Sequence, residues 1–248
     1  TITLAEGTNP ICSGQQVTLD AGAGFAAYVW APGGETSRTI TVSPAVTTTY
    51  SVTVGSPKCA EVQSSYTLTV ASPVTISLGI SGTPTVGLGT SLVFSANGGT
   101  PPFTWSLSGA IPGLSFGNGE MVGVPSLADT YMIDVTAQDS AGCSASQPFE
   151  ITVSNPTPVV TALSPSSRHA GSGGFTLTVA GSGFVPGATV AWGGAPRATT
   201  FVSAVELQAS ILAADVSVAG TTLVTVVNPA PGGGASNGIL FSTVAADV

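Results

Sequence analysis

Short runs in which apolar and polar residues alternate recur along the whole chain. Clear cases are residues 65–70 (SYTLTV), 149–153 (FEITV), 175–179 (FTLTV) and 223–227 (LVTVV). An alternation with a period of two places every second side chain on one face, as in a half-buried β-strand. No stretch of 12 residues carries the apolar stripe of an amphipathic helix. The pattern therefore predicts an all-β protein.

Proline-containing joints divide these strands into three groups. One alternating run ends at residues 72–73 (SP), and another ends at residues 155–158 (NPTP). Because proline restricts the backbone, these joints should be short and semi-rigid. We expect three domains at residues 1–71, 73–154 and 157–248, each large enough for about seven short strands.

The same order of strands recurs in each of the three segments. An alternating strand is followed by a strand that carries one of the three tryptophans of the chain, Trp30, Trp105 and Trp192. An immunoglobulin sandwich buries a tryptophan of its strand C between the two sheets, because the large ring fills a thin core. Equal placement in three segments favours this interpretation over three aromatic residues that fell in strands by chance. The sequence thus predicts three tandem immunoglobulin-like β-sandwiches.

Two tyrosines strengthen the comparison for the first two segments. Tyr50 and Tyr131 begin later alternating strands and resemble the tyrosine that pins the start of strand F in such sandwiches. We therefore expect both in the structural core. Residues 223–227 occupy the matching place in the third segment without a tyrosine, so that segment should share the architecture and differ in detail.

The charge of the chain excludes one large class of partner. Only 6% of the residues are charged, the formal net charge is -8, and the four basic side chains are scattered at Arg38, Lys58, Arg168 and Arg197. A nucleic-acid binder needs clustered basic residues to neutralise phosphates, so we expect no nucleic acid partner. No run of 18 apolar residues occurs, so we also expect no membrane insertion.

One short motif resembles a catalytic one. Residues 113–117 (GLSFG) match the G-x-S-x-G nucleophile elbow, in which a strand-to-helix turn exposes a serine near a histidine base. No helix follows Ser115, and the single histidine, His169, lies in another segment, so a structural loop is favoured. His169 alone also cannot build a zinc site. We expect no catalytic residue, no cofactor and no enzymatic activity.

Other polar clusters have simple structural interpretations. Asp129, Asp134 and Asp139 could supply oxygens to Ca²⁺, which takes six or more, but their spacing lacks a D-x-D-x-D loop and solvated turn acids are commoner. Residues 232–234 (GGG) are not a phosphate loop, because no Lys-Ser/Thr and no helix follow them. We interpret them as the F–G hairpin of the third segment.

Longer motifs resemble three families of bacterial immunoglobulin-like modules. The resemblance to the PKD-like modules of surface proteins lies in residues 11–14, 17–19, 28–33, 39–44 and 47–50. The resemblance to the putative-Ig, cadherin-like repeats of secreted proteins lies in residues 98–107, 112–115, 123–125 and 129–131. The resemblance to the IPT/TIG fold lies in residues 181–187, 190–194 and 228–234. The three resemblances cover nearly the whole chain, are specific for fold, and bring no family active-site residue with them.

Modules of these families serve as spacers, adhesins, fibre parts and enzyme accessories, so the resemblance is weak for function. It implies an extracellular or cell-surface protein that is a non-catalytic building block of a bacterial stalk, fibre or filament, with exposed edge strands that another chain can complete. Its partners would be subunits of the same kind or a surface receptor or glycan. The alternative is an accessory module of a secreted hydrolase, a carbohydrate-binding one included.

The three cysteines leave their pairing open at the level of geometry. Cys12 precedes strand B and Cys59 lies in the hairpin after strand F, and in a simple sandwich these points tend to lie at opposite ends. A disulfide needs Cα atoms within about 7 Å, so either the first strand is shifted or each cysteine pairs elsewhere, another subunit included. The resemblance to modules in which such cysteines recur as a pair implies a Cys12–Cys59 bridge. Cys143 would then be a buried free thiol.

Overall fold

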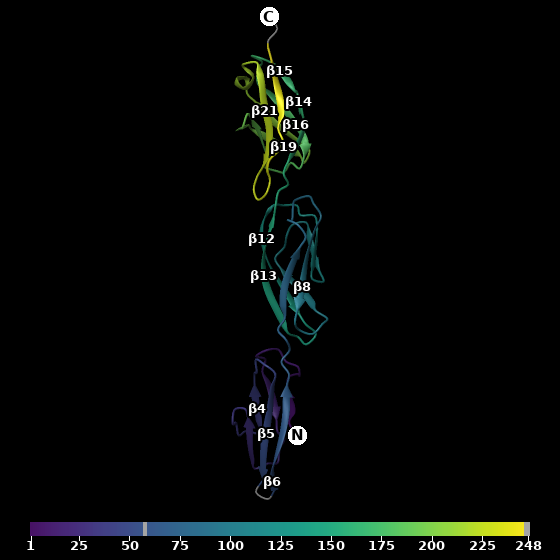
Figure 1. Ribbon diagram of the computed structural model, residues 1–248, viewed down its shortest axis with the longest axis vertical. Coiled ribbons are helices and arrows are strands. Elements are labelled where there is room, and N and C mark those ends of the chain that lie inside the picture. The colour runs from purple at the N-terminus through teal and green to yellow at the C-terminus, as the bar shows by residue number, and fades with distance from the viewer. Residues whose placement is uncertain (57–58, 246–248) are drawn as a thin grey trace.

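The computed structural model describes residues 1–56 and 59–245 as three β-sandwiches arranged end to end (Figure 1). The all-β, immunoglobulin-like fold predicted from the alternating pattern is confirmed. Within the described residues the only helix is a single 3-10 turn, η1 (Ala213–Val216), and no helix there is long and apolar enough to cross a bilayer. We call the sandwiches the first module (β1–β6), the second module (β7–β13) and the third module (β14–β23).

Each of the first two modules pairs two small antiparallel sheets. In the first module one sheet has the order β1 (Thr3–Glu6), β2 (Val17–Asp20), β4 (Thr39–Val42). The other sheet has the order β3 (Ala27–Ala31), β5 (Thr48–Ser56), β6 (Cys59–Leu68). In the second module one sheet has the order β10 (Leu114–Gly117), β11 (Glu120–Gly123), β8 (Thr90–Asn97), β7 (Thr75–Ile80). The other sheet has the order β13 (Ser144–Val153), β12 (Asp129–Gln138), β9 (Thr104–Ser108).

The third module is larger and has more strands. One sheet has the order β14-β16-β20-β19: Val159–Ser164, Phe175–Ser182, Glu206–Ile211 and Thr199–Ser203. The other sheet has the order β15 (Ser167–His169), β23 (Ile239–Val244), β21 (Gly220–Asn228), β17 (Thr189–Trp192), β18 (Ala195–Pro196). A short strand, β22 (Gly234–Ala235), also pairs with β21.

The chain enters the second and third modules at one end and leaves them at the other (Figure 1). An early segment of each module lies parallel to its last strand or to the residues just after it: Ile11 to Val70, Thr85 to Ser154, and β15 to β23. In the second and third modules the hairpin before the last strand therefore lies at the entry end, where it faces the preceding module. This polarity decides which loops meet at the joints.

Each module has its own hydrophobic core, in which the alternating strand residues meet. Trp30 is 1% exposed in the first core, and its indole Nε1 donates a 2.8 Å hydrogen bond to the Ser37 carbonyl oxygen. Trp192 is 5% exposed in the third core, where its ring centroid lies 4.9 Å from that of Phe241. Each ring thus fills the space between two sheets, and the Trp30 N–H is also satisfied.

Trp105 differs from the other two tryptophans. It lies on β9, which pairs with β12 as expected for strands C and F, but the side chain is only half-buried. Phe94 occupies the centre instead, with the rings of Phe116 and Phe149 6.0 and 5.4 Å away. Phe116 and Phe149 are partly buried and pack at the margin of this core, as Trp105 does, whereas Phe94 is one of its buried residues.

Both tyrosines lie near the start of the strand that matches strand F. Tyr131, on β12, donates a 3.0 Å hydrogen bond to the Leu127 carbonyl oxygen four residues upstream, which ties the strand to the loop before it. Burial, together with the Asp129 carboxylate, raises the pKa of the Tyr131 hydroxyl. Tyr50, on β5, is buried in the first core. Tyr50 thus lies at the same place in its strand as Tyr131 does, but no hydrogen bond from the Tyr50 hydroxyl occurs among the described residues.

A bidentate ion pair holds the short helix of the third module. Arg197 donates from Nε to Asp215 Oδ2 over 2.8 Å, and that oxygen also accepts the Leu212 N–H at the start of η1. The guanidinium lowers the pKa of the Asp215 carboxyl. This basic residue is therefore engaged within its own module.

Replacing Trp192 with alanine should lower the free energy of unfolding of the third module by about 3–5 kcal/mol, because a buried ring is lost and a cavity remains. Differential scanning calorimetry would resolve the transition of that module. Leu240→Ala is the matched control, since Leu240 is 61% exposed on β23 and its removal should change stability by less than about 0.5 kcal/mol. Equal effects of the two changes would contradict the placement of Trp192 in the core.

Candidate functional site: the two joints between modules

Neighbouring residues of the first joint bond to opposite modules. The Ala71 N–H donates to the Ile11 carbonyl oxygen of the first module over 2.8 Å. The carbonyl oxygen of the next residue, Ser72, accepts the Gly99 N–H of the second module over 3.1 Å. Gly98 has a φ of +74°, and a Cβ there would lie 2.1 Å from the Pro73 carbonyl oxygen, so only glycine fits against the linker. The linker is thus hydrogen-bonded to both modules within two consecutive residues.

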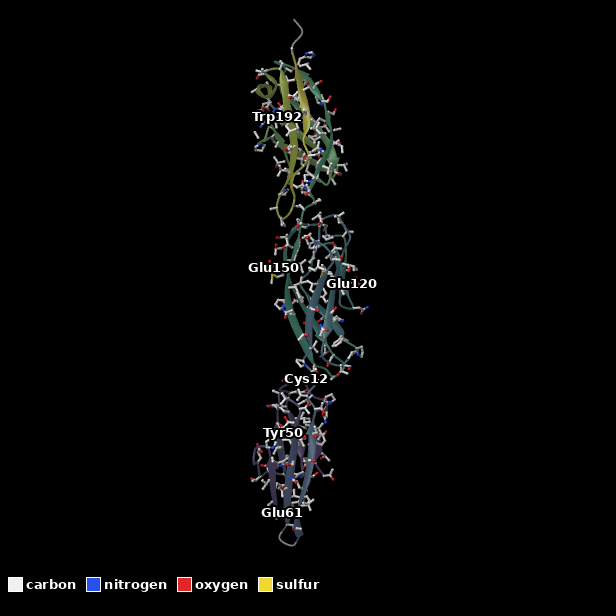
Figure 2. The ribbon with its side chains drawn as sticks, viewed as in Figure 1. Cys12, Tyr50, Glu61, Glu120, Glu150 and Trp192 are labelled. Carbon is white, nitrogen blue, oxygen red and sulfur yellow. A yellow bond between two sulfur atoms is a disulfide. The ribbon has the colours of Figure 1, made fainter. Side chains whose placement is uncertain are left out.

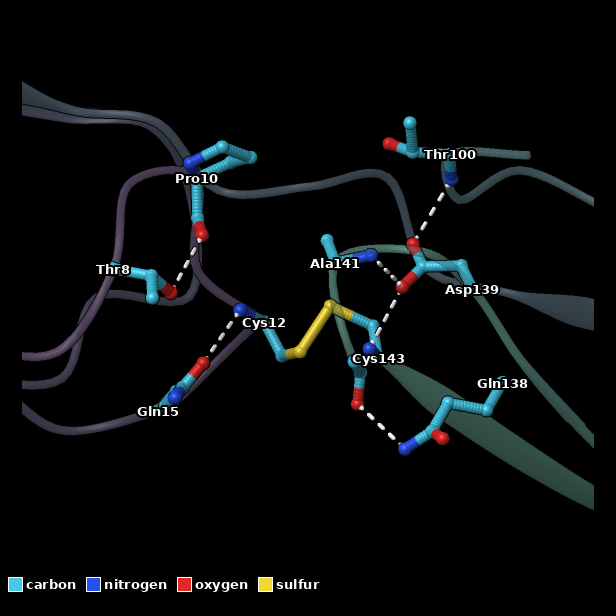
Figure 3. Close-up of a disulfide and its surroundings, with 10 residues drawn as sticks. Thr8, Pro10, Cys12, Gln15, Thr100, Gln138, Asp139, Ala141 and Cys143 are labelled. Atoms are coloured by element: carbon cyan, nitrogen blue, oxygen red, sulfur yellow. Dashed lines mark hydrogen bonds between the residues drawn. A yellow bond between two sulfur atoms is a disulfide. The ribbon is translucent and has the colours of Figure 1, made fainter. Parts of the chain in front are cut away.

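A disulfide spans the same joint. Cys12 of the first module is bonded to Cys143 of the second, with a Cα–Cα distance of 5.4 Å and a sequence separation of 131 (Figure 3). Cys143 lies in the β12–β13 hairpin, and Cys12 lies in the segment between β1 and β2. The bond therefore ties together the two loops that face each other across the joint, in addition to the backbone linker.

Asp139 organises the hairpin that presents Cys143. The carboxylate is 5% exposed; Oδ1 accepts the N–H groups of Ala141 and Cys143 over 3.0 and 2.8 Å, and Oδ2 accepts that of Thr100 over 2.9 Å (Figure 3). Hydrogen bonds to an ionised acceptor are stronger than neutral ones. On the other side of the bond, Gln15 Oε1 accepts the Cys12 N–H over 3.1 Å. Both half-cystines are held by backbone hydrogen bonds.

The pairing of Cys12 with Cys143 corrects two predictions. The expected Cys12–Cys59 bridge is wrong, and Cys143 is a half-cystine rather than a free thiol. Cys59 begins β6, and Glu61 near it lies at the end of the first module opposite to Cys12 (Figure 2). The geometric objection to the Cys12–Cys59 pair was therefore correct. The side chain of Cys59 lies outside the described residues.

The second joint repeats the alternation without a disulfide. Ser154 forms a parallel bridge to Thr85 of the second module, and the next residue, Asn155, forms one to Gly232 of the third. The Asn155 N–H donates to the Pro231 carbonyl oxygen over 2.7 Å, and its side-chain Nδ2 donates to that of Pro229 over 2.9 Å. The part of the chain held by the second module and the part held by the third thus meet at the peptide bond between Ser154 and Asn155.

The loop that makes these contacts connects β21 to β22 and faces the second module, as the polarity of the chain requires (Figure 1). A Cβ on Gly232, which has a φ of +68°, would lie 2.5 Å from the Ser154 Cβ. Asn228, at the end of β21, is 2% exposed and donates from Nδ2 to the Pro156 carbonyl oxygen over 2.8 Å. Gly232 and Gly233 therefore act in the joint through their backbone, and Gly234 pairs with Asn228 in the F–G connection where residues 232–234 were expected.

A small cavity lies beside the second joint. Its volume is about 200 Å³, below the range of about 300–1,000 Å³ typical of small-molecule sites. The lining is mostly apolar and comes from both modules, and it includes Val86, Leu127, Asn155, Val185 and Pro229. The cavity is thus a gap in the packing of two modules rather than a developed binding pocket.

The residues that resembled a catalytic pair are not brought together. Ser115 lies on β10 of the second module, opposite Val122, so the motif forms a strand and its turn rather than the loop that we expected. His169 lies on β15 of the third module, with Nδ1 3.1 Å from the Ala245 carbonyl oxygen. Neither residue lies in a strand-to-helix turn, and they belong to separate modules.

The three aspartates considered for Ca²⁺ are also separated. Asp129 and Asp139 lie at the two ends of β12, about 30 Å apart at the usual rise of a strand, and Asp134 lies exposed between them. Asp139 uses its oxygens on backbone N–H groups, and Asp129 Oδ1 accepts the Thr130 N–H. Within residues 1–56 and 59–245 no three His, Cys, Asp or Glu side chains gather as a metal site would require.

Comparison with known proteins identifies one module. Residues 158–243 match the family described as IPT/TIG domain, so the third module contains a domain of that kind. Domains of this immunoglobulin-like type are generally non-catalytic, and in tandem they are typical of adhesive or structural proteins. A search of curated proteins found no relative with significant sequence similarity.

Solved tandem immunoglobulin structures are similar to the whole chain at low identity. Sidekick-1 domains 1–5 align with 98% of this chain at 14% identity and a TM-score of 0.35, and the chain spans 58% of that structure. The insect immune protein hemolin aligns with 98% at 11% identity (TM-score 0.38, 75% of hemolin), and the I9–I11 tandem of titin with 99% at 10% identity (TM-score 0.39, 99% of the tandem).

Peptide mapping under non-reducing conditions should yield a linked peptide that contains Cys12 and Cys143. Trypsin alone leaves Cys59 and Cys143 on one fragment, residues 59–168, so a second protease that cuts after glutamate is needed. Cleavage at Glu61 and Glu120 then separates the two candidates. A peptide that links Cys12 to Cys59 would overturn the pairing.

Replacing Asp139 with alanine should destabilise the second module by at least about 2 kcal/mol, because three buried or part-buried N–H groups lose their acceptor. Thermal unfolding monitored by circular dichroism would measure the loss. Asp134→Ala removes the same charge from an exposed position on β12 and should have little effect. A similar loss in both variants would show that net charge, rather than the hairpin, is responsible.

Proposed function

We propose that the chain is a rigid, non-catalytic building block of an extracellular bacterial stalk, fibre or filament, with a structural or adhesive role. The observation that carries this proposal is the Cys12–Cys143 bond across the first joint. A protein whose modules work independently has no need for a covalent tie between them, whereas a spacer or stalk depends on the direction in which one module continues the next. Both joints serve that requirement.

The disulfide also supports an extracellular or cell-surface location. Disulfides persist in oxidising compartments and are rare in the cytosol. The low content of charged residues and the many hydroxyl side chains agree with a protein that acts through shape rather than through an electrostatic site. The partners would be further copies of the same chain, or a surface receptor or glycan at the ends and edges of the rod.

We further assign the first module to the PKD-like type and the second to the putative-Ig, cadherin-like type, on the motifs at residues 11–50 and 98–131. Together with the IPT/TIG domain these would form domains 1–71, 73–154 and 157–248 of a surface protein. The strand groups support this division, since the ladders among the described strands stay within the three modules.

A role as a carbohydrate-binding accessory of a secreted hydrolase is the competing proposal, and the aromatic residues speak against it. Sugar-binding modules use exposed aromatic faces, whereas Trp30 and Trp192 lie in cores and Trp105 is half-buried. Phe25, at 40%, is the exposed aromatic side chain in the described part of the chain. A binding platform needs more than one such ring.

Electron micrographs of the purified chain should show straight rods, and the native material should show rods joined into fibres or stalks. Compact, bent particles, or specific binding of the monomer to a glycan array, would instead favour the hydrolase accessory. The double variant Cys12→Ser/Cys143→Ser should bend more widely at the first joint than at the second. Cys59→Ser, which keeps the Cys12–Cys143 bond, is the matched control and should look like the unmodified protein.

A further inference from the structure

The Cys12–Cys143 bond creates a second covalent route through the chain. From Cys12 a path can continue along the backbone through residues 13–142, or cross the disulfide directly to Cys143. When a chain with a cross-link is stretched from its two ends, its greatest length is set by the shorter route. About 130 residues lie on the longer one.

In the first module the shorter route includes only residues 1–12. The sole strand on it is β1, which pairs with β2, and the remaining strands lie on the bypassed segment. Ile2 and Ile11 are core residues of this module. Even if tension pulled them out, the chain could lengthen there by no more than those twelve residues.

In the second module the shorter route runs from Cys143 directly into β13 and leaves at Ser154. This strand runs along the length of the module, from the first joint to the second (Figure 1). A β-strand already rises about 3.3 Å per residue, close to the limit for an extended chain. Tension along β13 therefore gains almost no length, whether the other strands of the module stay folded or not.

From this connectivity we infer that the Cys12–Cys143 disulfide is a tension bypass, which keeps residues 13–142 out of the stretched path. The inference rests on the proposed function, in that a fibre or stalk is pulled along its axis. Under tension between the chain ends, the first two modules act as an inextensible element. Reduction of one bond would release all the length stored in them.

The third module then sets how the oxidised chain yields. Tension enters it at Asn155 and leaves at the end of β23, so the N-terminal strands and the last strand are pulled in opposite directions. Ser167, Arg168 and His169 of β15 pair in parallel with Ser242, Thr243 and Val244 of β23. Such a pull shears this ladder along its length and loads its hydrogen bonds together. The third module is thus the extensible part of the oxidised chain.

Single-molecule stretching between the two ends tests the bypass, with handles attached by peptide tags that use no thiol. Oxidised protein should lengthen mainly by unfolding of the third module, whose residues 155–248 span about 330 Å when extended at about 3.5 Å per residue. The gain is this length less the folded length of the module. After reduction, the same molecule at high force should be longer by about a further 450 Å, the extended length of residues 13–142. Cys59→Ser should behave like unmodified protein in both conditions.

The double variant Cys12→Ser/Cys143→Ser should reach the longer extension without reducing agent. This comparison holds even if the variant folds poorly, because the final length at high force depends on covalent connectivity alone. An oxidised molecule that reaches the full length of all three modules would overturn the bypass and leave the rod shape untouched. Conversely, a short oxidised extension in a protein that forms no fibre would uphold the bypass and count against the proposed function.

Discussion

Hydrogen bonds from neighbouring backbone groups to opposite modules are the constraint on which the shape of this protein depends. At the first joint the alternation falls between Ala71 and Ser72, and at the second it falls between Ser154 and Asn155. A tandem array of sandwiches with free linkers would sample many angles between modules, because each module has a separate core. Here the linker belongs to both neighbours, and their relative direction is part of the fold.

The polarity of each sandwich determines which loops can reinforce a joint. The F–G hairpin of a module faces the module before it, so the β12–β13 hairpin meets the first module and the β21–β22 loop meets the second. The first joint uses this contact for a disulfide, and the second uses it for backbone hydrogen bonds to Asn155. The F–G connection thus contributes a covalent bond at the first joint and backbone hydrogen bonds at the second.

The period-two pattern predicted the strands well, because burial on one face of a sheet imposes it locally. The burial of Trp30 and Trp192 followed for the same reason. Trp105 is instead half-buried beside a core that contains Phe94, a packing outcome that no single strand encodes. The disulfide was missed because it depends on contact between modules. A signal existed: Cys143 precedes the last strand of its segment and Cys12 follows the first strand of the segment before, so both belong at the shared joint. The resemblance to modules with paired cysteines favoured Cys12–Cys59 instead.

The alternation at Ser154 and Asn155 has a consequence for how the molecule could be cut. Proteases act on segments that can be drawn out as several consecutive residues with unbonded backbone groups, and in most multidomain proteins the linkers offer them. Here each linker is short and is hydrogen-bonded to both of the modules beside it. Attack should therefore begin in loops on the sides of the sandwiches, and a single cut between residues 13 and 142 would leave two pieces still joined by sulfur.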